Sequence, residues 1–128
     1  MASIVLDTLL YVDGGSRRNG DESQEGYGSF LVDGEQTPHR LEFGSCTNNE
    51  AEYRALIAAL EYCAAKGIRV PTVRMDSALV VNQVKGRWKC KMRHLRPLLD
   101  LVHVLVAQFA EFRLEWRDHD EIFTFLGH

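Results

Sequence analysis

Short runs of hydrophobic residues divide the first third of the chain. Residues 3–12 are rich in β-branched and aliphatic side chains, a composition typical of a strand, and this run stops at Asp13. Two more runs lie within residues 26–43, on either side of Asp33-Gly34, a residue pair common in hairpin turns. The pattern therefore predicts a three-stranded antiparallel meander.

The spacing of apolar residues becomes helical after residue 46. Thr47 and Glu50 are spaced as a capping box, which marks the start of a helix, and Gly67 marks its end. The apolar residues between them recur at helical intervals: Tyr53, Leu56, Ile57, Leu60 and Cys63. We predict a long helix with one buried face.

The second half of the chain contains shorter elements. Residues 70–76 form a β-rich run, and residues 77–86 start with a capping serine and end with a glycine, as short helices do. A longer helix is predicted over residues 93–109. Apolar and charged residues then alternate over 112–117, which predicts a last strand with one buried face. The predicted order of elements is βββαβααβ.

Composition indicates a single domain over residues 1–128, since 45% of the residues are hydrophobic and the chain is long enough to bury a core. The net charge of −3 gives no global positive field for nucleic acid. No apolar run is long enough to span a bilayer, so we expect no membrane contact. We expect the chain to act as a monomer.

The three cysteines, Cys46, Cys63 and Cys90, show no metal-ligand spacing. Their odd number, in a chain without a signal peptide, favours reduced thiols and a cytoplasmic location. Small buried side chains are the simplest interpretation of all three.

Charge is concentrated in residues 85–96, which we call the basic segment. This segment contains six Lys or Arg residues and no Asp or Glu, whereas the rest of the chain is acidic. Five of them recur at every second position, so an extended segment would point these side chains one way, toward phosphates: Lys85, Arg87, Lys89, Lys91 and Arg93. An ordinary solvated surface is the alternative interpretation.

Two aspartates follow β-rich runs directly. If the strands ending at Asp13 and Asp76 are parallel neighbours, both carboxylates lie at the edge of the sheet where ligands bind in α/β proteins. Like charges held close together are costly unless a cation lies between them. Hard divalent cations such as Mg²⁺ prefer such oxygen ligands. Asp13 is thus a candidate metal ligand, although an Asp before two glycines is also a common turn former.

Three stretches carry a resemblance to a known family: "YVDGGSRRNG", "TNNEAEYRALIAALE" and "VRMDSALVVNQVKGRWKCK". Together they resemble the type 1 ribonuclease H family, especially its compact archaeal-type and bacterial members. The resemblance implies an α/β, ribonuclease H-like fold, with a five-stranded mixed sheet of three antiparallel strands and then parallel strands, flanked by helices. It also implies a metal-dependent endonuclease that cleaves the RNA strand of RNA/DNA hybrids.

The resemblance also implies site residues. Asp13, Glu52 and Asp76 fall at the family's metal-binding carboxylates, which hold two ions of Mg²⁺, with Mn²⁺ as an alternative. Glu52 is preferred over Glu50 because Glu50 has a capping role, whereas Glu52 precedes Leu56 by a helical period and can point toward the sheet.

Contacts to the minor groove of the hybrid are implied for residues near both glycines and at the start of the first helix. The substrate-binding candidates are Gly14, Gly15, Ser16, Asn19, Thr47, Asn48 and Asn49. Thr47 falls where the family binds a phosphate of the DNA strand, and a purely structural cap is the alternative for this residue.

The C-terminus departs from the family. Leu126 occupies the register of the fourth catalytic aspartate, so we expect the usual C-terminal helix to be absent or shortened. Asp120, with Asp118 as second choice, is the candidate replacement, and His119 is a candidate for the family's loop histidine. Alternatively, His128 is that histidine and the chain stops before the final helix.

The sequence thus predicts a ribonuclease H activity. The first alternative is a weakly active or inactive domain that binds the hybrid. The second is another nuclease of the same fold, such as a resolvase or a proofreading exonuclease. The Asn48-Asn49-x-x-Glu52 pattern at the start of the first helix argues against this second alternative.

Overall fold

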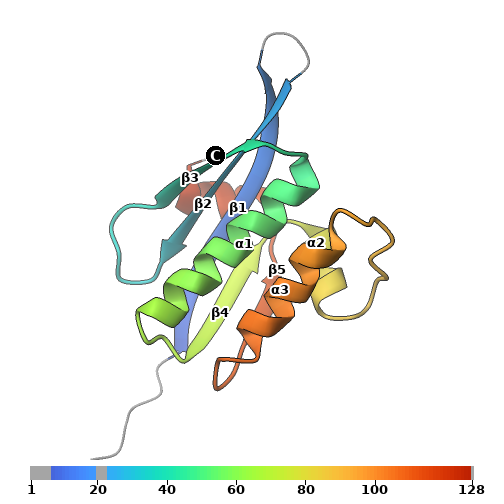
Figure 1. Cartoon of the computed structure of the whole chain (residues 1–128). Helices are drawn as coiled ribbons and strands as arrows, with labels where there is room; N and C mark the ends of the chain where they lie inside the picture. The colour runs from blue at the N-terminus through green and yellow to red at the C-terminus, as the bar shows by residue number, and fades with distance from the viewer. Residues whose placement is uncertain (1–6, 20–22, 128) are drawn as a thin grey trace, which may run out of the picture.

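The sheet of the computed structural model confirms the predicted meander. The structure describes residues 7–19 and 23–127. Its strands are β1 (Asp7–Asn19), β2 (Ser23–Val32), β3 (His39–Ser45), β4 (Val70–Met75) and β5 (Arg113–Trp116). They are ordered β3-β2-β1-β4-β5. The first three strands pair antiparallel, and β4 and β5 extend the sheet in parallel, as the resemblance implied (Figure 1).

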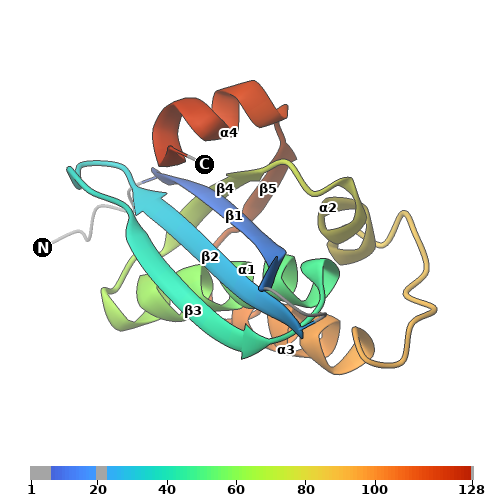
Figure 2. The same cartoon turned by 90° about the horizontal axis from the view of Figure 1, so that it is seen from above.

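Helices cover both faces of this sheet. They are α1 (Asn48–Ala65), α2 (Ala78–Val84), α3 (Arg96–Val106) and α4 (His119–Leu126). Figure 2 shows α1 and α3 on one face and α4 on the other. Over residues 7–19 and 23–127, none of the helices combines the length and the apolar character needed to cross a bilayer.

Strand β1 contributes to two hydrophobic cores. Leu10 and Val12 are completely buried in the main core, which α1 and α3 cover. Tyr11 lies in a smaller core, where it packs against Ile122 and Leu126 of α4. Successive side chains of a strand point to opposite faces, so this alternation lets β1 hold both layers of helices.

The helix ends follow the sequence signals. Thr47 Oγ1 accepts a hydrogen bond from the Glu50 backbone N–H at 3.2 Å, and a Glu50 carboxylate oxygen accepts one from the Thr47 N–H at 3.0 Å. This is the predicted capping box. Ser77 caps α2 by accepting from the Val80 N–H, and Gly67 adopts a left-handed φ of 75° just after α1. The start and end of α1 were thus predicted correctly.

Three boundaries differ from the prediction. Strand β1 continues past Asp13 to Asn19 because it goes on pairing with β2, whereas its parallel pairing with β4 ends at Tyr11. Helix α3 starts at Arg96 instead of residue 93, and it ends at Val106 instead of residue 109. Pro97 has no backbone N–H to donate, so it is tolerated only within the first turn of a helix.

Helix α4 was missing from the predicted order βββαβααβ. Asp118 caps its start by accepting from the Glu121 N–H at 2.9 Å, and Gly127 ends it in a left-handed conformation. Ile122 and Leu126, four residues apart, are its buried residues. A helix of eight residues shows only two turns of periodicity, too few to distinguish it from an irregular segment by pattern alone.

Candidate active site

Parallel pairing brings the two strand-end aspartates together. Tyr11 of β1 pairs with Arg74 of β4, and Asp13 and Asp76 each lie two residues further along. Both therefore lie at the same edge of the sheet, as predicted. A hydrogen bond joins their carboxyl groups, and Asp13 is 8% exposed.

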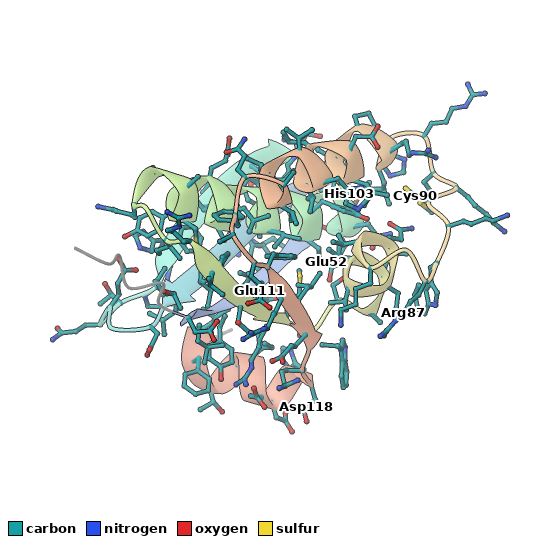
Figure 3. The ribbon with its side chains drawn as sticks, turned by 90° about the horizontal axis from the view of Figure 1, so that it is seen from below. Glu52, Arg87, Cys90, His103, Glu111 and Asp118 are labelled. Carbon is teal, nitrogen blue, oxygen red and sulfur yellow. The ribbon has the colours of Figure 1, made fainter. Side chains whose placement is uncertain are left out.

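The start of α1 brings a third carboxylate to this edge. A Cβ atom on Gly14 would collide with the backbone carbonyl of Ala51 and lie 2.8 Å from Glu52 Cα. Glycine at this position therefore allows α1 to approach β1 closely. The Glu52 carboxylate accepts a hydrogen bond from Ser77, and in Figure 3 it lies on the side of α1 that faces α2.

Burial and mutual repulsion disfavour charge on this cluster. Burial, followed by the charge and hydrogen bond of Asp76, raises the pKa of Asp13 from 3.8 to about 7. Burial also raises the pKa of Glu52 from 4.5 to about 7; Ser77 opposes this shift, and the charges of Asp76 and Asp13 add to it. Carboxyl groups this reluctant to ionise have pKa values typical of functional sites.

Trp116, the last residue of β5, and His119, the first residue of α4, both contact Asp76. His119 Nδ1 lies 3.1 Å from an Asp76 carboxylate oxygen, and the hydrogen bond raises the pKa of His119. The indole N–H of Trp116 donates to the backbone carbonyl of Asp76 at 3.1 Å. The Trp116 contact was not foreseen, because a tryptophan in an alternating strand gives no sequence signal for such a bond.

The donor chemistry of the cluster fits a hard divalent cation, since one buried and two half-buried carboxylates offer the oxygen ligands that Mg²⁺ prefers. The side chains are nevertheless paired with protein partners: Asp13 with Asp76, Asp76 with His119, and Glu52 with Ser77. Across the part of the chain that the structure describes, no three His, Cys, Asp or Glu side chains are arranged to hold an ion. A bound cation would displace the proton of the Asp13–Asp76 hydrogen bond, whereas an ionised carboxylate has enough acceptor sites to keep Ser77 or His119 as a partner.

The fourth carboxylate stays a prediction. Leu126 is 1% exposed and packs against Tyr11 and Ile122, so a core side chain occupies the register of the family's aspartate. Asp118 caps α4 and Asp120 lies in the first turn of that helix, where its charge helps to raise the pKa of His119. Figure 3 shows Asp118 at the start of α4.

Six of the seven predicted substrate-binding residues lie where β1 meets the start of α1, and Asn19 lies further along, at the end of β1. The Ser16 backbone N–H donates to Asn48 Oδ1 at 3.2 Å, and a Cβ on Gly15 would lie 3.2 Å from that same oxygen. Asn49 lies in the first turn of α1, and Thr47 serves as its cap. Their contacts with nucleic acid stay predictions. The side chain of Asn19, and His128, fall outside the described residues.

The basic segment is an exposed loop between α2 and the start of α3 (Figure 2). Hydrogen-bonded turns and irregular backbone, and no strand, make up residues 85–95. Trp88 and Met92 within it are 49% and 50% exposed. Its predicted contacts with phosphates are not tested by the fold.

This topology defines a ribonuclease H-like fold. The structure matches the crystal structure of RNase H1 from Halobacterium salinarum with a TM-score of 0.82 and 30% identity, covering 91% of this chain and 89% of that one. It also matches LC11-RNase H1, solved in complex with an RNA/DNA hybrid, with a TM-score of 0.78 and 26% identity over 89% and 87% of the two chains.

Sequence comparisons agree with this class. The family model described as reverse transcriptase-like matches residues 39–122. The bifunctional protein Rv2228c of Mycobacterium tuberculosis is 37% identical over 115 residues, which cover 87% of this chain and 31% of that protein. The chain thus spans about a third of the length of this curated relative. The chain belongs to the type 1 ribonuclease H family.

Proposed function

We propose that this protein is a metal-dependent endonuclease that hydrolyses the RNA strand of RNA/DNA hybrids. The observation that carries the proposal is the convergence of Asp13, Glu52 and Asp76, from β1, α1 and the end of β4, on one edge of the sheet. Family membership supports the same conclusion, because relatives of this fold are named as ribonucleases H.

The three carboxylates are the proposed ligands of two Mg²⁺ or Mn²⁺ ions. When bound, such ions promote ionisation of the attacking water and stabilise charge on the leaving oxygen. Asp13 is central to the cluster, because its carboxyl group bonds to Asp76 and its charge acts on Glu52. His119 and Trp116 orient Asp76 through its carboxylate and its backbone carbonyl. Asp120 is the proposed fourth carboxylate.

Substrate recognition is assigned to the junction of β1 and α1. Backbone groups at Gly14 and Gly15, with the amide of Asn48, face the same region as the candidate ligands, since Gly14 touches the backbone at Glu52. Amides both donate and accept hydrogen bonds, which suits the base edges and ribose hydroxyls of a minor groove. Ser16, Asn19, Thr47 and Asn49 complete the proposed contact surface. LC11-RNase H1, crystallised with an RNA/DNA hybrid, supports this substrate class.

A second candidate function is hybrid binding with weak or no cleavage. The specific observation in its favour is Leu126, which fills the register of the fourth aspartate and is buried in the core under α4. A site with three carboxylates would hold the second ion poorly. Binding would then persist while the cleavage rate falls.

We also propose that the protein is cytoplasmic and monomeric. Cys46, Cys63 and Cys90 are free thiols, and the first two are buried. Free thiols suit a reducing compartment.

A panel of labelled substrates tests the proposed function. The protein is incubated with an RNA/DNA hybrid, double-stranded RNA, double-stranded DNA and branched DNA, each with Mg²⁺, Mn²⁺ or a chelator. We expect internal cuts in the RNA strand of the hybrid alone, and only with metal. Hybrid binding without cleavage would favour the second candidate, and cleavage of duplex or branched DNA would overturn the substrate assignment.

A further inference from the structure

A buried amide connects the core of the protein to the basic segment. Gln83 is 5% exposed and lies in α2. Its Oε1 accepts a hydrogen bond from the Tyr53 hydroxyl at 2.6 Å, and its Nε2 donates to the backbone carbonyl of Lys89 at 3.3 Å. Both ends of one amide are therefore used, one toward α1 and the other toward the loop.

The position of this bond within the basic segment is informative. Two hydrogen bonds fix the start of the segment to α2: the backbone N–H groups of Arg87 and Trp88 donate to the carbonyl of Asn82 at 2.9 and 3.2 Å. It rejoins the core at Leu95, which is completely buried. The residues between, 91–94, are all exposed. The bond from Gln83 to Lys89 thus holds the loop near its middle.

The far end of the connection lies in the main core. Tyr53 is completely buried in α1, and burial of its hydroxyl raises its pKa. Tyr53 directly follows Glu52, so one turn of α1 carries both a candidate metal ligand and the support of the basic segment. If either partner of the buried Gln83 amide moved away, the amide would lose a hydrogen bond and gain none from water. This cost keeps both hydrogen bonds of Gln83 in place.

We propose that Gln83 is a positioning residue for hybrid binding, because it holds the basic segment at a fixed place relative to Glu52. The inference rests on the proposed function. Lys85, Arg87, Lys89 and Lys91 would then meet the phosphates of a hybrid whose scissile bond lies at the carboxylate cluster. Loss of the connection frees the loop, so that fewer of these cations face the substrate at the same time.

The test compares steady-state hydrolysis of the hybrid, with Mg²⁺, by the wild type and by Gln83→Met. Methionine has a similar volume. It has no amide oxygen to accept the hydrogen bond of the Tyr53 hydroxyl, and no N–H to donate to the carbonyl of Lys89. We expect KM to rise about tenfold with kcat nearly unchanged, and the dependence of log KM on log salt concentration to become shallower as phosphate contacts are lost. A purely structural defect would leave the salt dependence as it is.

Two further variants make the test specific. Tyr53→Phe removes one end of the connection with little change of volume, and should give a smaller rise in KM in the same direction. Asn82→Ala is the matched control: its side-chain amide bonds to Ala78, while its backbone carbonyl, which holds Arg87 and Trp88, is retained. Asn82→Ala should therefore behave as the wild type.

The outcomes separate this inference from the proposed function. If the wild type cleaves the hybrid but Gln83→Met and Tyr53→Phe keep its KM and its salt dependence, the positioning role is wrong and the proposed function stands. A fall in kcat without a change in KM would also contradict it. If the wild type neither binds nor cleaves the hybrid, the proposed function fails and this inference fails with it. When Gln83→Met does not fold, Tyr53→Phe alone decides.

Discussion

Replacing Asp13 by asparagine is expected to stabilise the metal-free protein while removing its activity. The Asp13 carboxyl group is buried beside Asp76, and its pKa rises from 3.8 to about 7. The folded state therefore binds a proton more readily than the unfolded chain. As pH increases from about 4 to about 7, this carboxyl destabilises the fold progressively, because ionisation is easier in the unfolded state.

The size of the effect follows from the shift in pKa. Each pKa unit corresponds to about 1.4 kcal/mol of difference between the protonation states, so a rise of about three units corresponds to at most about 4 kcal/mol above pH 7. Asparagine keeps the shape of the side chain and cannot ionise. Asp13→Asn should therefore be a few kcal/mol more stable than the wild type at about pH 8 and nearly equal to it at about pH 4.

The assay is chemical denaturation in the presence of a chelator, at both pH values, with the free energy of unfolding obtained for each protein. Addition of Mg²⁺ provides an internal check. An ion that binds only the folded state at ten times its Kd stabilises that state by about 1.4 kcal/mol, and we expect this gain for the wild type alone. A difference between the two proteins that does not depend on pH, or a loss of stability in Asp13→Asn at high pH, would refute the reasoning.

Three more predictions test other parts of the structure. Leu126→Ala should lower the free energy of unfolding by about 3 kcal/mol, as for other buried leucines, and a change near zero by denaturation would remove Leu126 from the core. Gly14→Ala should destabilise the protein by about 1–3 kcal/mol and slow hybrid cleavage, because the new methyl group presses on the backbone beside Glu52; normal stability and rate would show that α1 can move away. If Asp120 supplies the fourth carboxylate, Asp120→Asn should slow single-turnover cleavage at least about tenfold, whereas Asp118→Asn, which keeps a capping side chain, should not. Unchanged rates in both would indicate a site with three carboxylates.

The parts of the fold that the sequence predicted are those with local chemical signals. The capping box of Thr47 and Glu50 specifies the start of α1, and the turn at Asp33-Gly34 specifies the β2–β3 hairpin. The residues that make up each of these signals lie within a few positions of each other, so the physical cause is visible in a short stretch of sequence. The convergence of Asp13 and Asp76 was also predictable, because parallel strands align their carboxyl ends.

The parts that were missed depend on tertiary contacts. Strand β1 extends past Asp13 because it finds a partner in β2, and nothing in residues 14–19 alone indicates this pairing. Helix α4 exists because Ile122 and Leu126 find a second core on Tyr11, across more than 110 residues of chain. The bonds from Gln83 to Tyr53 and Lys89 likewise join residues whose spacing carries no pattern.

The central claim is that Asp13, Glu52 and Asp76 form the active site of a ribonuclease H. Its most direct test is single-turnover cleavage of an end-labelled RNA/DNA hybrid with Mg²⁺, by the wild type and by Asp13→Asn, Glu52→Gln and Asp76→Asn. Glu50→Gln is the matched control, because glutamine still completes the capping box. We predict internal cleavage of the RNA strand by the wild type and by Glu50→Gln, and rates at least about 100-fold lower in the other three variants. Equal losses in Glu50→Gln and Glu52→Gln, or cleavage that survives in Asp13→Asn, would contradict the claim.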